Sequence, residues 1–87
     1  MMKVTVKIKR TFTDKAKLKA VASLCFDDSF KIEGVKLIEG NNGYFLSMPS
    51  VRKPDGSYAG TCFPINNDFR KHILELYINA YNEYENI

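Results

Sequence analysis

Apolar and polar residues alternate from the start of the chain. Val4, Val6 and Ile8 are separated by Thr and Lys residues, and this period of two is typical of a half-buried β-strand. Residues 18–26 form a second expected strand, with apolar residues on both of its faces, so we expect it to be covered on both sides. Residues 30–39 form a third. Because its apolar phase shifts at Gly34, we expect a β-bulge there.

Turn residues separate these strands. We place turns at residues 13–15 and 27–29, where short polar residues gather. The strongest turn signal is Gly-Asn-Asn-Gly at residues 40–43, because Asn-Gly tolerates the positive φ angles that tight hairpins need. A fourth strand is expected at residues 44–48. It should end at Pro49, because the proline nitrogen cannot donate to a strand ladder.

The following stretch is polar. We expect residues 50–60 to form a loop built around a β-turn at Pro54-Asp55-Gly56. Residues 61–63, Thr-Cys-Phe, are expected to form a short fifth strand.

One amphipathic helix is predicted after these strands. Three candidate N-caps precede it, because their side-chain oxygens can accept the free N–H groups of a first turn: Asn66, Asn67 and Asp68. Apolar residues recur at helical spacing in two sets, which are Phe69, Ile73, Leu76, Ala80, Tyr84 and Ile87, and then Leu74, Tyr77, Ile78 and Tyr81. Together the two sets make an apolar surface on the helix that is wider than one sheet face would cover. Either a second subunit covers the remainder, or the helix nests in a curved sheet with its tyrosine hydroxyls in water.

Several strands followed by one helix predict the α+β class. We expect an antiparallel β-sheet of four to five strands followed by one long C-terminal α-helix. The 87 residues fit one domain, 1–87, with strands at about 2–64 and the helix at about 67–85.

The composition is that of an ordinary globular protein, with 45% apolar and 26% charged residues. No apolar run approaches the ~20 residues that span a bilayer, and the first residues lack the apolar region of a signal peptide. We therefore expect a cytoplasmic protein. Cys25 and Cys62 are interpreted as reduced core thiols rather than a disulfide. There is no CxxC pair and no ligand partner for His72, so we expect no metal and no cofactor.

Charge is distributed unevenly along the chain. Residues 1–20 carry seven Lys or Arg residues and one acid, Asp14. After residue 72 all the charged residues are acidic, namely Glu75, Glu83 and Glu85. The basic part favours an anionic partner, although a solvated charged face explains it almost as well.

Several segments, taken in order, resemble the stage V sporulation protein G (SpoVG) family. Lys-Ala-Val-Ala-Ser at residues 19–23 and Phe-Asp-Asp-Ser-Phe at 26–30 are similar to the family's opening motif. Ile-Glu-Gly-Asn-Asn-Gly-Tyr-Phe-Leu-Ser-Met-Pro-Ser at 38–50 is similar to its central motif. Pro-Asp-Gly at 54–56 and Pro-Ile-Asn at 64–66 then follow in the expected order. The resemblance covers residues 3–81.

The resemblance implies a bacterial DNA- and RNA-binding regulator, named for roles in sporulation and septum formation. It also implies an antiparallel sheet with a C-terminal helix, and dimers that join their sheets edge to edge. The chain departs from the family pattern in three places, one of them Phe69, where a small or hydroxylated residue usually precedes the helix arginine. Val51 stands where a basic residue is usual, with the basic pair displaced to Arg52-Lys53, and Phe63 replaces a histidine whose role cannot carry over.

Two basic pairs are the leading candidates for nucleic-acid contact. Arg52 and Lys53 lie in the polar loop, where cations can approach phosphates and release counterions; the alternative is a solvated hairpin tip. Arg70 and Lys71 lie in the first helical turn, where the macrodipole disfavours cations but N–H groups and cations together attract anions. The alternative there is a salt bridge to Asp68 or Glu75.

Weaker candidates come from the strands. Lys7 and Lys9, with Lys19 on the neighbouring strand, could form a basic sheet face or simply keep a sheet edge soluble. The tyrosines at 44, 58 and 77 could stack on unpaired bases, although core or rim packing is commoner. The adjacent acids Asp27 and Asp28 do not make a catalytic pair, because neighbouring strand residues point to opposite faces.

Two functions remain open. The first is a homodimeric nucleic-acid-binding regulator with no catalytic residues, no metal and no membrane insertion. The second is a protein-interaction module that acts on a division or regulatory partner through its sheet edge or apolar helix. No glycine-rich phosphate loop and no cysteine with a histidine at recognised spacing support an enzyme.

Overall fold

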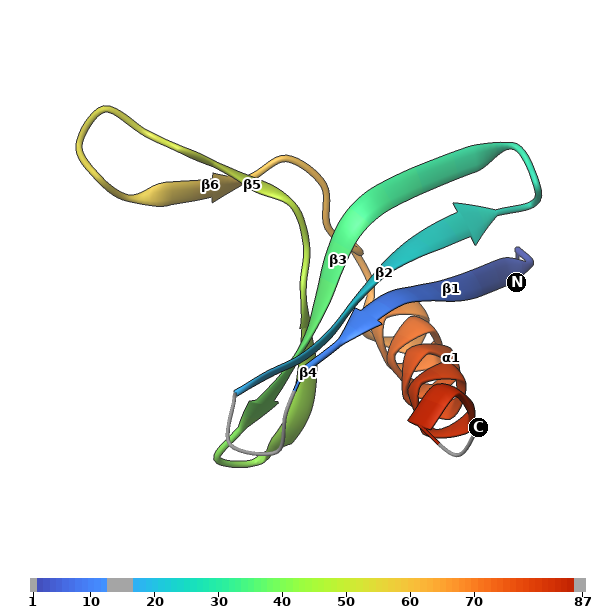
Figure 1. The fold of residues 1–87 in the computed structure, drawn as a ribbon. Helices are drawn as coiled ribbons and strands as arrows, with labels where there is room; N and C mark the ends of the chain where they lie inside the picture. The colour runs from blue at the N-terminus through green and yellow to red at the C-terminus, as the bar shows by residue number, and fades with distance from the viewer. Residues whose placement is uncertain (1, 13–16, 86–87) are drawn as a thin grey trace.

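The computed structural model describes residues 2–12 and 17–85 (Figure 1). Four strands form one antiparallel sheet in the order β1-β2-β3-β4, and two more form a separate antiparallel hairpin. In chain order the elements are β1 (Val4–Thr11), β2 (Leu18–Phe26), β3 (Phe30–Gly40), β4 (Gly43–Ser47), β5 (Ser50–Arg52), β6 (Tyr58–Gly60) and α1 (Asn67–Glu85). The predicted α+β class is confirmed.

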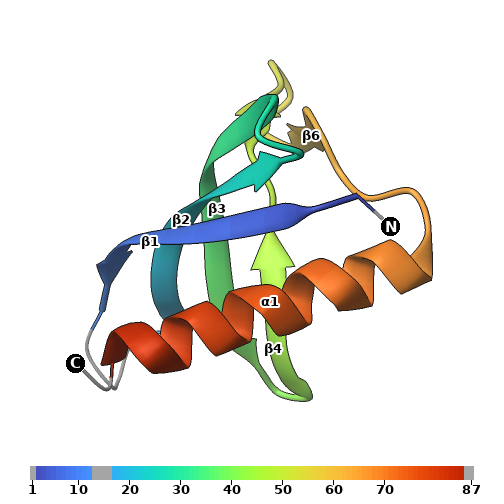
Figure 2. The same cartoon turned by 90° about the vertical axis from the view of Figure 1, so that its right-hand side faces the viewer.

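Helix α1 lies across one face of the four-stranded sheet (Figure 2). The fully buried core lies between them and consists of Ala20, Ala22, Leu24, Val35, Leu37, Ile73 and Tyr77. The Tyr77 hydroxyl donates a hydrogen bond of 2.8 Å to the carbonyl oxygen of Val35, and burial raises the pKa of this phenol well above its usual value. Within the described ranges no helix or strand covers the opposite face of the sheet (Figures 1 and 2). Neighbouring side chains still shield β2 there, because Ser23 is 2% exposed and Val21 and Cys25 are half-buried, so β2 is largely buried on both of its sides as expected.

Bulges change which residues share a face of the sheet. Between β2 and β3 the pairs are Ala22 with Val35 and Leu24 with Ile32, so two β3 residues stand opposite one β2 residue. Gly34 lies in this bulge with a φ of 76°, which confirms the bulge predicted there. Between β1 and β2 the register passes from Ile8 directly to Arg10. This second bulge has no glycine or proline to mark it in the sequence.

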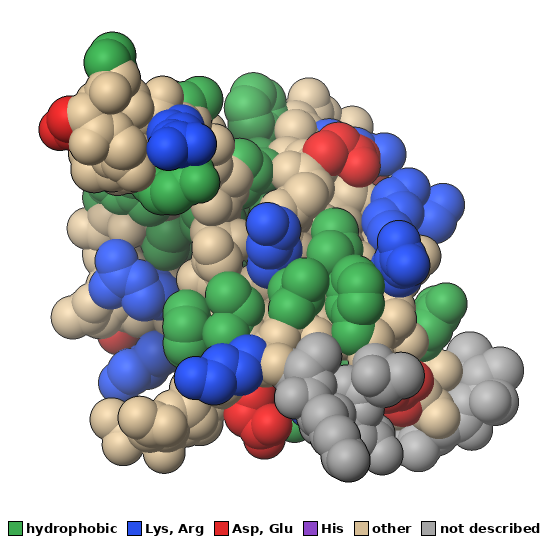
Figure 3. Space-filling view, turned by 60° about the vertical axis from the view of Figure 1, so that its left-hand side comes forward, with side chains coloured by type: hydrophobic (Ala, Val, Ile, Leu, Met, Phe, Trp, Pro, Cys, Tyr) green, Lys and Arg blue, Asp and Glu red, His purple; other side chains and the backbone are tan. Residues whose placement is uncertain are grey.

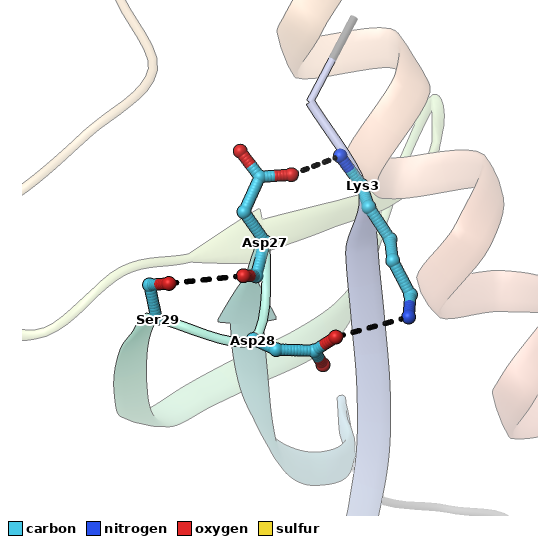
Figure 4. A network of polar contacts seen from close by, with 4 residues as sticks. All are labelled: Lys3, Asp27, Asp28 and Ser29. Atoms are coloured by element: carbon cyan, nitrogen blue, oxygen red, sulfur yellow. Dashed lines mark hydrogen bonds and ion pairs between the residues drawn. The ribbon is translucent and has the colours of Figure 1, made fainter.

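The turn between β2 and β3 holds the start of β1 (Figure 4). The backbone N–H of Lys3 donates to Oδ1 of Asp27 at 2.8 Å, and the N–H of Asp27 donates to the Lys3 carbonyl at 2.8 Å. The Lys3 ammonium also pairs with Asp28 at 3.1 Å. Both aspartates have positive φ, 52° and 56°, as a type I′ turn requires. They are turn residues rather than strand residues, so the face-alternation argument does not apply to them.

The segment after β4 differs from its prediction. Residues 50–60 form the β5–β6 hairpin rather than a loop, and the turn at Pro54-Asp55-Gly56 connects its strands. The fifth strand expected at residues 61–63 is wrong, because the returning strand lies three residues earlier, at Tyr58–Gly60. Thr61 instead donates its backbone N–H and its hydroxyl to the carbonyl oxygen of Pro49, closing the base of the hairpin.

Helix α1 begins at one of the three candidate caps. Asn66 Oδ1 accepts the N–H of Phe69 at 2.7 Å. The helix buries Ile73 and Tyr77, with Phe69, Leu74, Ile78 and Tyr81 partly buried against the core. The side chains that pack on the sheet therefore recur every four residues, at Ile73, Tyr77 and Tyr81. Tyr84, which belongs to the first predicted set, is 43% exposed. The predicted turn at residues 13–15 lies outside the described residues.

Candidate nucleic-acid interface

The β5–β6 hairpin projects away from the sheet and the helix (Figure 1). Its tip is well ordered by hydrogen bonds. The N–H of Lys53 donates to the Ser57 carbonyl at 2.7 Å, and the N–H of Gly56 donates to the Lys53 carbonyl at 3.0 Å. The Ser57 hydroxyl and N–H both donate to Oδ1 of Asp55, and these bonds lower the pKa of that carboxyl. The tip is thus a defined support for the two cations it carries.

Arg52 is the last residue of β5 and Lys53 follows it; both are exposed. Arg52 stands opposite Tyr58 in the hairpin register. Directly paired residues of an antiparallel hairpin share a face, so the two side chains project from the same face of the hairpin. Tyr58 is 68% exposed. A cation beside an open aromatic ring can contact a phosphate and an unpaired base together.

At the start of α1 the two predicted cations play different roles. Nη1 of Arg70 donates to Oδ1 of Asn67 at 2.7 Å, and Nη2 donates to the Pro64 carbonyl at 3.2 Å. Arg70 therefore ties the preceding loop to the helix, in place of the salt bridge to Asp68 or Glu75 considered above. Lys71 is exposed on the same turn. At this end of the helix Lys71 remains available for contact with an anion. Arg70 has a structural role, and part of its side chain stays exposed.

The strand lysines are separated by the bulge in β1. Lys7 pairs with Ser23, on the face of the sheet away from α1, whereas Lys9 is the residue that the register skips. Lys19 is only 7% exposed and its ammonium lies 3.5 Å from Glu39. The predicted grouping of Lys7, Lys9 and Lys19 is therefore not the one that the fold forms.

The fold instead brings Lys7 together with three cations that are not among the predicted site residues. Arg10 and Lys36 both pair with Val21, and Lys31 pairs with Cys25. All four cations are exposed and lie on the face opposite the helix. In Figure 3, Lys and Arg side chains surround hydrophobic side chains on this side of the molecule. The signal was present in the sequence, because a bulge at Gly34 with Ile32 and Val35 in the core places Lys31 and Lys36 outside.

The other candidates have packing roles. Tyr77 is fully buried, and Tyr44 lies edge-on to Tyr81 with ring centroids 6.4 Å apart and is 36% exposed. Of the three tyrosines, Tyr58 is the most open. The ring of His72 lies 6.4 Å from that of Phe69. Cys25 and Cys62 are half-buried free thiols.

The described part of the chain also bears on metals and membranes. Among residues 2–12 and 17–85 no three His, Cys, Asp or Glu side chains gather as a metal site would require. In the same ranges, no helix has the length and apolar character needed to cross a membrane.

Comparison with known proteins gives one consistent family. The family model described as SpoVG matches residues 1–83. Relatives from Staphylococcus carnosus (strain TM300), Staphylococcus aureus (strain MRSA252) and Staphylococcus haemolyticus (strain JCSC1435) each carry the name "Putative septation protein SpoVG" and are each 39% identical over 87 residues. The alignments cover 99% of this chain and 80%, 86% and 86% of those relatives. The ordered motifs, the family match and the full-length similarity agree, and the chain belongs to the SpoVG family.

Proposed function

We propose that this protein is a nucleic-acid-binding regulator linked to sporulation and cell septation, which acts in the cytoplasm as a homodimer and catalyses no reaction. Membership of the SpoVG family and the septation names of its relatives support the biological role. One observation carries the molecular part. The β5–β6 hairpin stands out from the domain and presents Arg52, Lys53 and Tyr58 together.

The hairpin suits contact with a phosphate backbone. Because it projects, it can reach a nucleic acid without a clash between the ligand and the sheet. Cations at its end gain affinity by releasing condensed counterions, and Arg52 can form two parallel hydrogen bonds to one phosphate. Lys71 at the start of α1 adds a further exposed cation, and Arg70 holds the loop that connects this helix to the hairpin. DNA and RNA share the backbone that these residues would contact.

The two edges of the sheet support the homodimer. β1 and β4 are the outer strands, and β1 carries several lysines and arginines, which discourage edge pairing. β4 has the sequence Gly-Tyr-Phe-Leu-Ser, with no charge, and Phe45 is 48% exposed. An uncharged edge with an exposed aromatic side chain is the kind that pairs with another strand. We therefore assign the dimer contact to β4, where two copies would join their sheets into one.

Charge reversal at the hairpin tests this function. The double variant Arg52→Glu/Lys53→Glu should lose at least 100-fold in affinity for a labelled oligonucleotide at low salt, because two phosphate contacts become repulsive. Fluorescence anisotropy measures the affinity, and circular dichroism checks the fold. Lys17→Glu is the control for added negative charge, since Lys17 is exposed and lies outside the strands. An unchanged affinity in the double variant would remove the hairpin from the interface.

An apolar hollow favours the second function, a protein-interaction module. It has a volume of about 300 Å³ and lies between β4, the segment after β6 and α1. Phe63 on its rim is 65% exposed, and Ile65 nearby is 89% exposed. An apolar segment of a division or regulatory protein could fill this hollow. Capture of one defined partner that survives both nuclease treatment and high salt, and fails in Phe63→Asp, would favour this function over nucleic-acid binding.

A further inference from the structure

The uncovered face of the sheet has an ordered pattern of charge. β1 contributes Lys7 and Arg10, and β3 contributes Lys31 and Lys36. Between these two rows runs the part of β2 from Val21 to Cys25, whose residues on this face are uncharged: Val21 and Cys25 are half-buried and Ser23 is 2% exposed. Since neighbouring strands lie ~4.8 Å apart, the two rows of cations lie roughly 10 Å from each other. The face thus has a neutral strip about one polynucleotide strand wide with cations along both sides.

Bulges create this pattern. Lys7 and Arg10 are three residues apart, and Lys31 and Lys36 are five apart. In an unbroken strand, residues separated by an odd number point to opposite faces. One bulge lies between the two cations of each pair, at Lys9 in β1 and at Gly34 in β3. The extra residue of each bulge shifts the alternation by one position, so both cations of a pair lie on the outer face. Without the bulges, one cation of each row would point toward the helix and the core.

The net charge of this face is positive. Among the described residues, Glu33 in the β3 bulge is the acid closest to these cations, and it lies 3.8 Å from Lys31. Arg10 is held over the ring of Phe12, 5.1 Å from its centroid. Lys7 and Lys36 extend into solvent. The face is therefore complementary to a polyanion.

An aromatic ring lies at one side of the strip. Phe45 of β4 pairs with Ile38 of β3 on the outer face. Its ring rests against Gly40, where a Cβ atom would come within 3.0 Å of Cε1 of the ring. Because Gly40 has no side chain, the Phe45 ring can lie against the sheet with 48% of the residue still exposed. A ring held in this way is a platform on which an unpaired base can stack.

We infer that this face of the sheet binds a single strand of DNA or RNA, with its phosphates along β2 between the two rows of cations and one base stacked on Phe45. The inference rests on the proposed function, because the ligand is a nucleic acid, but it uses a surface other than the hairpin. A flat sheet reads unpaired bases by stacking, whereas a duplex hides its bases and admits only a protruding helix or ribbon into its major groove. The strip and the ring therefore fit a single strand and not a duplex.

The test uses the full chain and three labelled oligonucleotides of equal length: oligo-dT, oligo-U and a DNA duplex. The double variant Lys7→Gln/Lys36→Gln removes one cation from each row without touching the core. Each cation that contacts a single strand contributes roughly 0.7 to the slope of log affinity against log salt. At 0.1 M salt the double variant should therefore bind oligo-dT or oligo-U about 25-fold more weakly, with a slope reduced by about 1.4. Its affinity for the duplex should change less than twofold.

Phe45 has its own pair of variants. Phe45→Leu should bind the single strands about fivefold or more weakly with an unchanged salt slope, because stacking is lost and charge is kept. Phe45→Tyr should retain wild-type affinity. The control Lys17→Gln removes one cation outside the face and should leave both single-strand affinities within twofold of wild type.

Failure of this inference and failure of the proposed function give different results. If Lys7→Gln/Lys36→Gln binds single strands like wild type while Arg52→Glu/Lys53→Glu does not, the hairpin binds nucleic acid and the sheet face does not. If the sheet-face variant loses duplex and single-strand binding equally, the face is not specific for single strands and the inference is overturned. If the wild-type protein binds none of the three ligands at low salt, the proposed function itself is wrong.

Discussion

Single residues decide how the core and the exposed surfaces are held. Tyr77 combines the largest buried side chain of the core with a hydroxyl bonded to Val35. Its burial keeps the phenol neutral in the folded protein, because a phenolate there would lose its hydration. Gly40 contributes through the absence of a side chain, because this absence leaves room for the ring of Phe45. Neither role follows from residue type alone; both depend on which strand lies next to which.

Replacement of Tyr77 by phenylalanine tests the buried hydroxyl. Tyr77→Phe leaves the Val35 carbonyl without its donor and should lower the free energy of unfolding by about 1 kcal/mol at pH 7. Urea denaturation followed by circular dichroism measures this. The pKa of Tyr77 is raised in the folded state, so only the unfolded chain releases this proton just above pH ~10. Wild-type stability should therefore fall above that pH by more than the stability of Tyr77→Phe does. Parallel curves for the two proteins would contradict the buried, neutral phenol.

The sequence predicts some helices and strands more completely than others. The first three strands and the helix have strong periodicity, and their residues were identified almost to the observed ends. The β5–β6 hairpin was missed because its strands are three residues long and mostly polar, so no alternation marks them. Thr61 and Phe63 have strand propensity, but tertiary context uses this segment to close the hairpin instead.

The bulges limit what could be predicted of the site. Gly34 marks its bulge, so the sequence predicts this one. The bulge at Lys9 has no such marker, so a strict period of two grouped Lys7 with Lys9 rather than with Arg10. A register of this kind is fixed by pairing with β2 and not by the sequence of β1 itself.

Substitution of the bulge glycine tests this element. Gly34 has a φ of 76° and open space around the position of a Cβ atom. Gly34→Ala should therefore lower stability through backbone strain alone, by about 1–2 kcal/mol, and Gly34→Asn should cost less because asparagine tolerates positive φ. Thermal and urea unfolding measure both. Equal stability of the alanine variant and wild type would show that this backbone conformation is not maintained in solution.

At the scale of the whole molecule, the sheet has one covered face and one open face, and two edges of different character. The helix uses one face to complete the core. The hairpin and the open face both present cations, and the uncharged β4 edge is the one at which we propose pairing with a second copy of the chain. Pairing at this edge would place two open faces side by side in one continuous surface.

The mass of the protein in solution tests the dimer. Sedimentation equilibrium should give twice the chain mass of 10.0 kDa, because we propose that β4 pairs with its copy. Tyr44→Lys adds a charge to this edge and should shift the protein toward the monomer, since charged side chains discourage edge pairing. Lys9→Glu on the β1 edge serves as the control and should leave the mass unchanged. A wild-type monomer at all concentrations, or a dimer unaffected by Tyr44→Lys, would contradict the assigned contact.

The measurement that tests the central claim most directly is a fluorescence-anisotropy titration of the wild-type protein with single-stranded RNA, single-stranded DNA and duplex DNA over a range of salt concentrations. We expect binding that weakens as salt increases, with a slope at least as steep as roughly −3 for a single strand, because the four cations of the open face alone contribute about that much, and tighter binding to the single strands than to the duplex. An absence of binding at low salt, or an affinity that does not change with salt, would contradict the account and direct attention to the apolar hollow beside Phe63 and a protein partner.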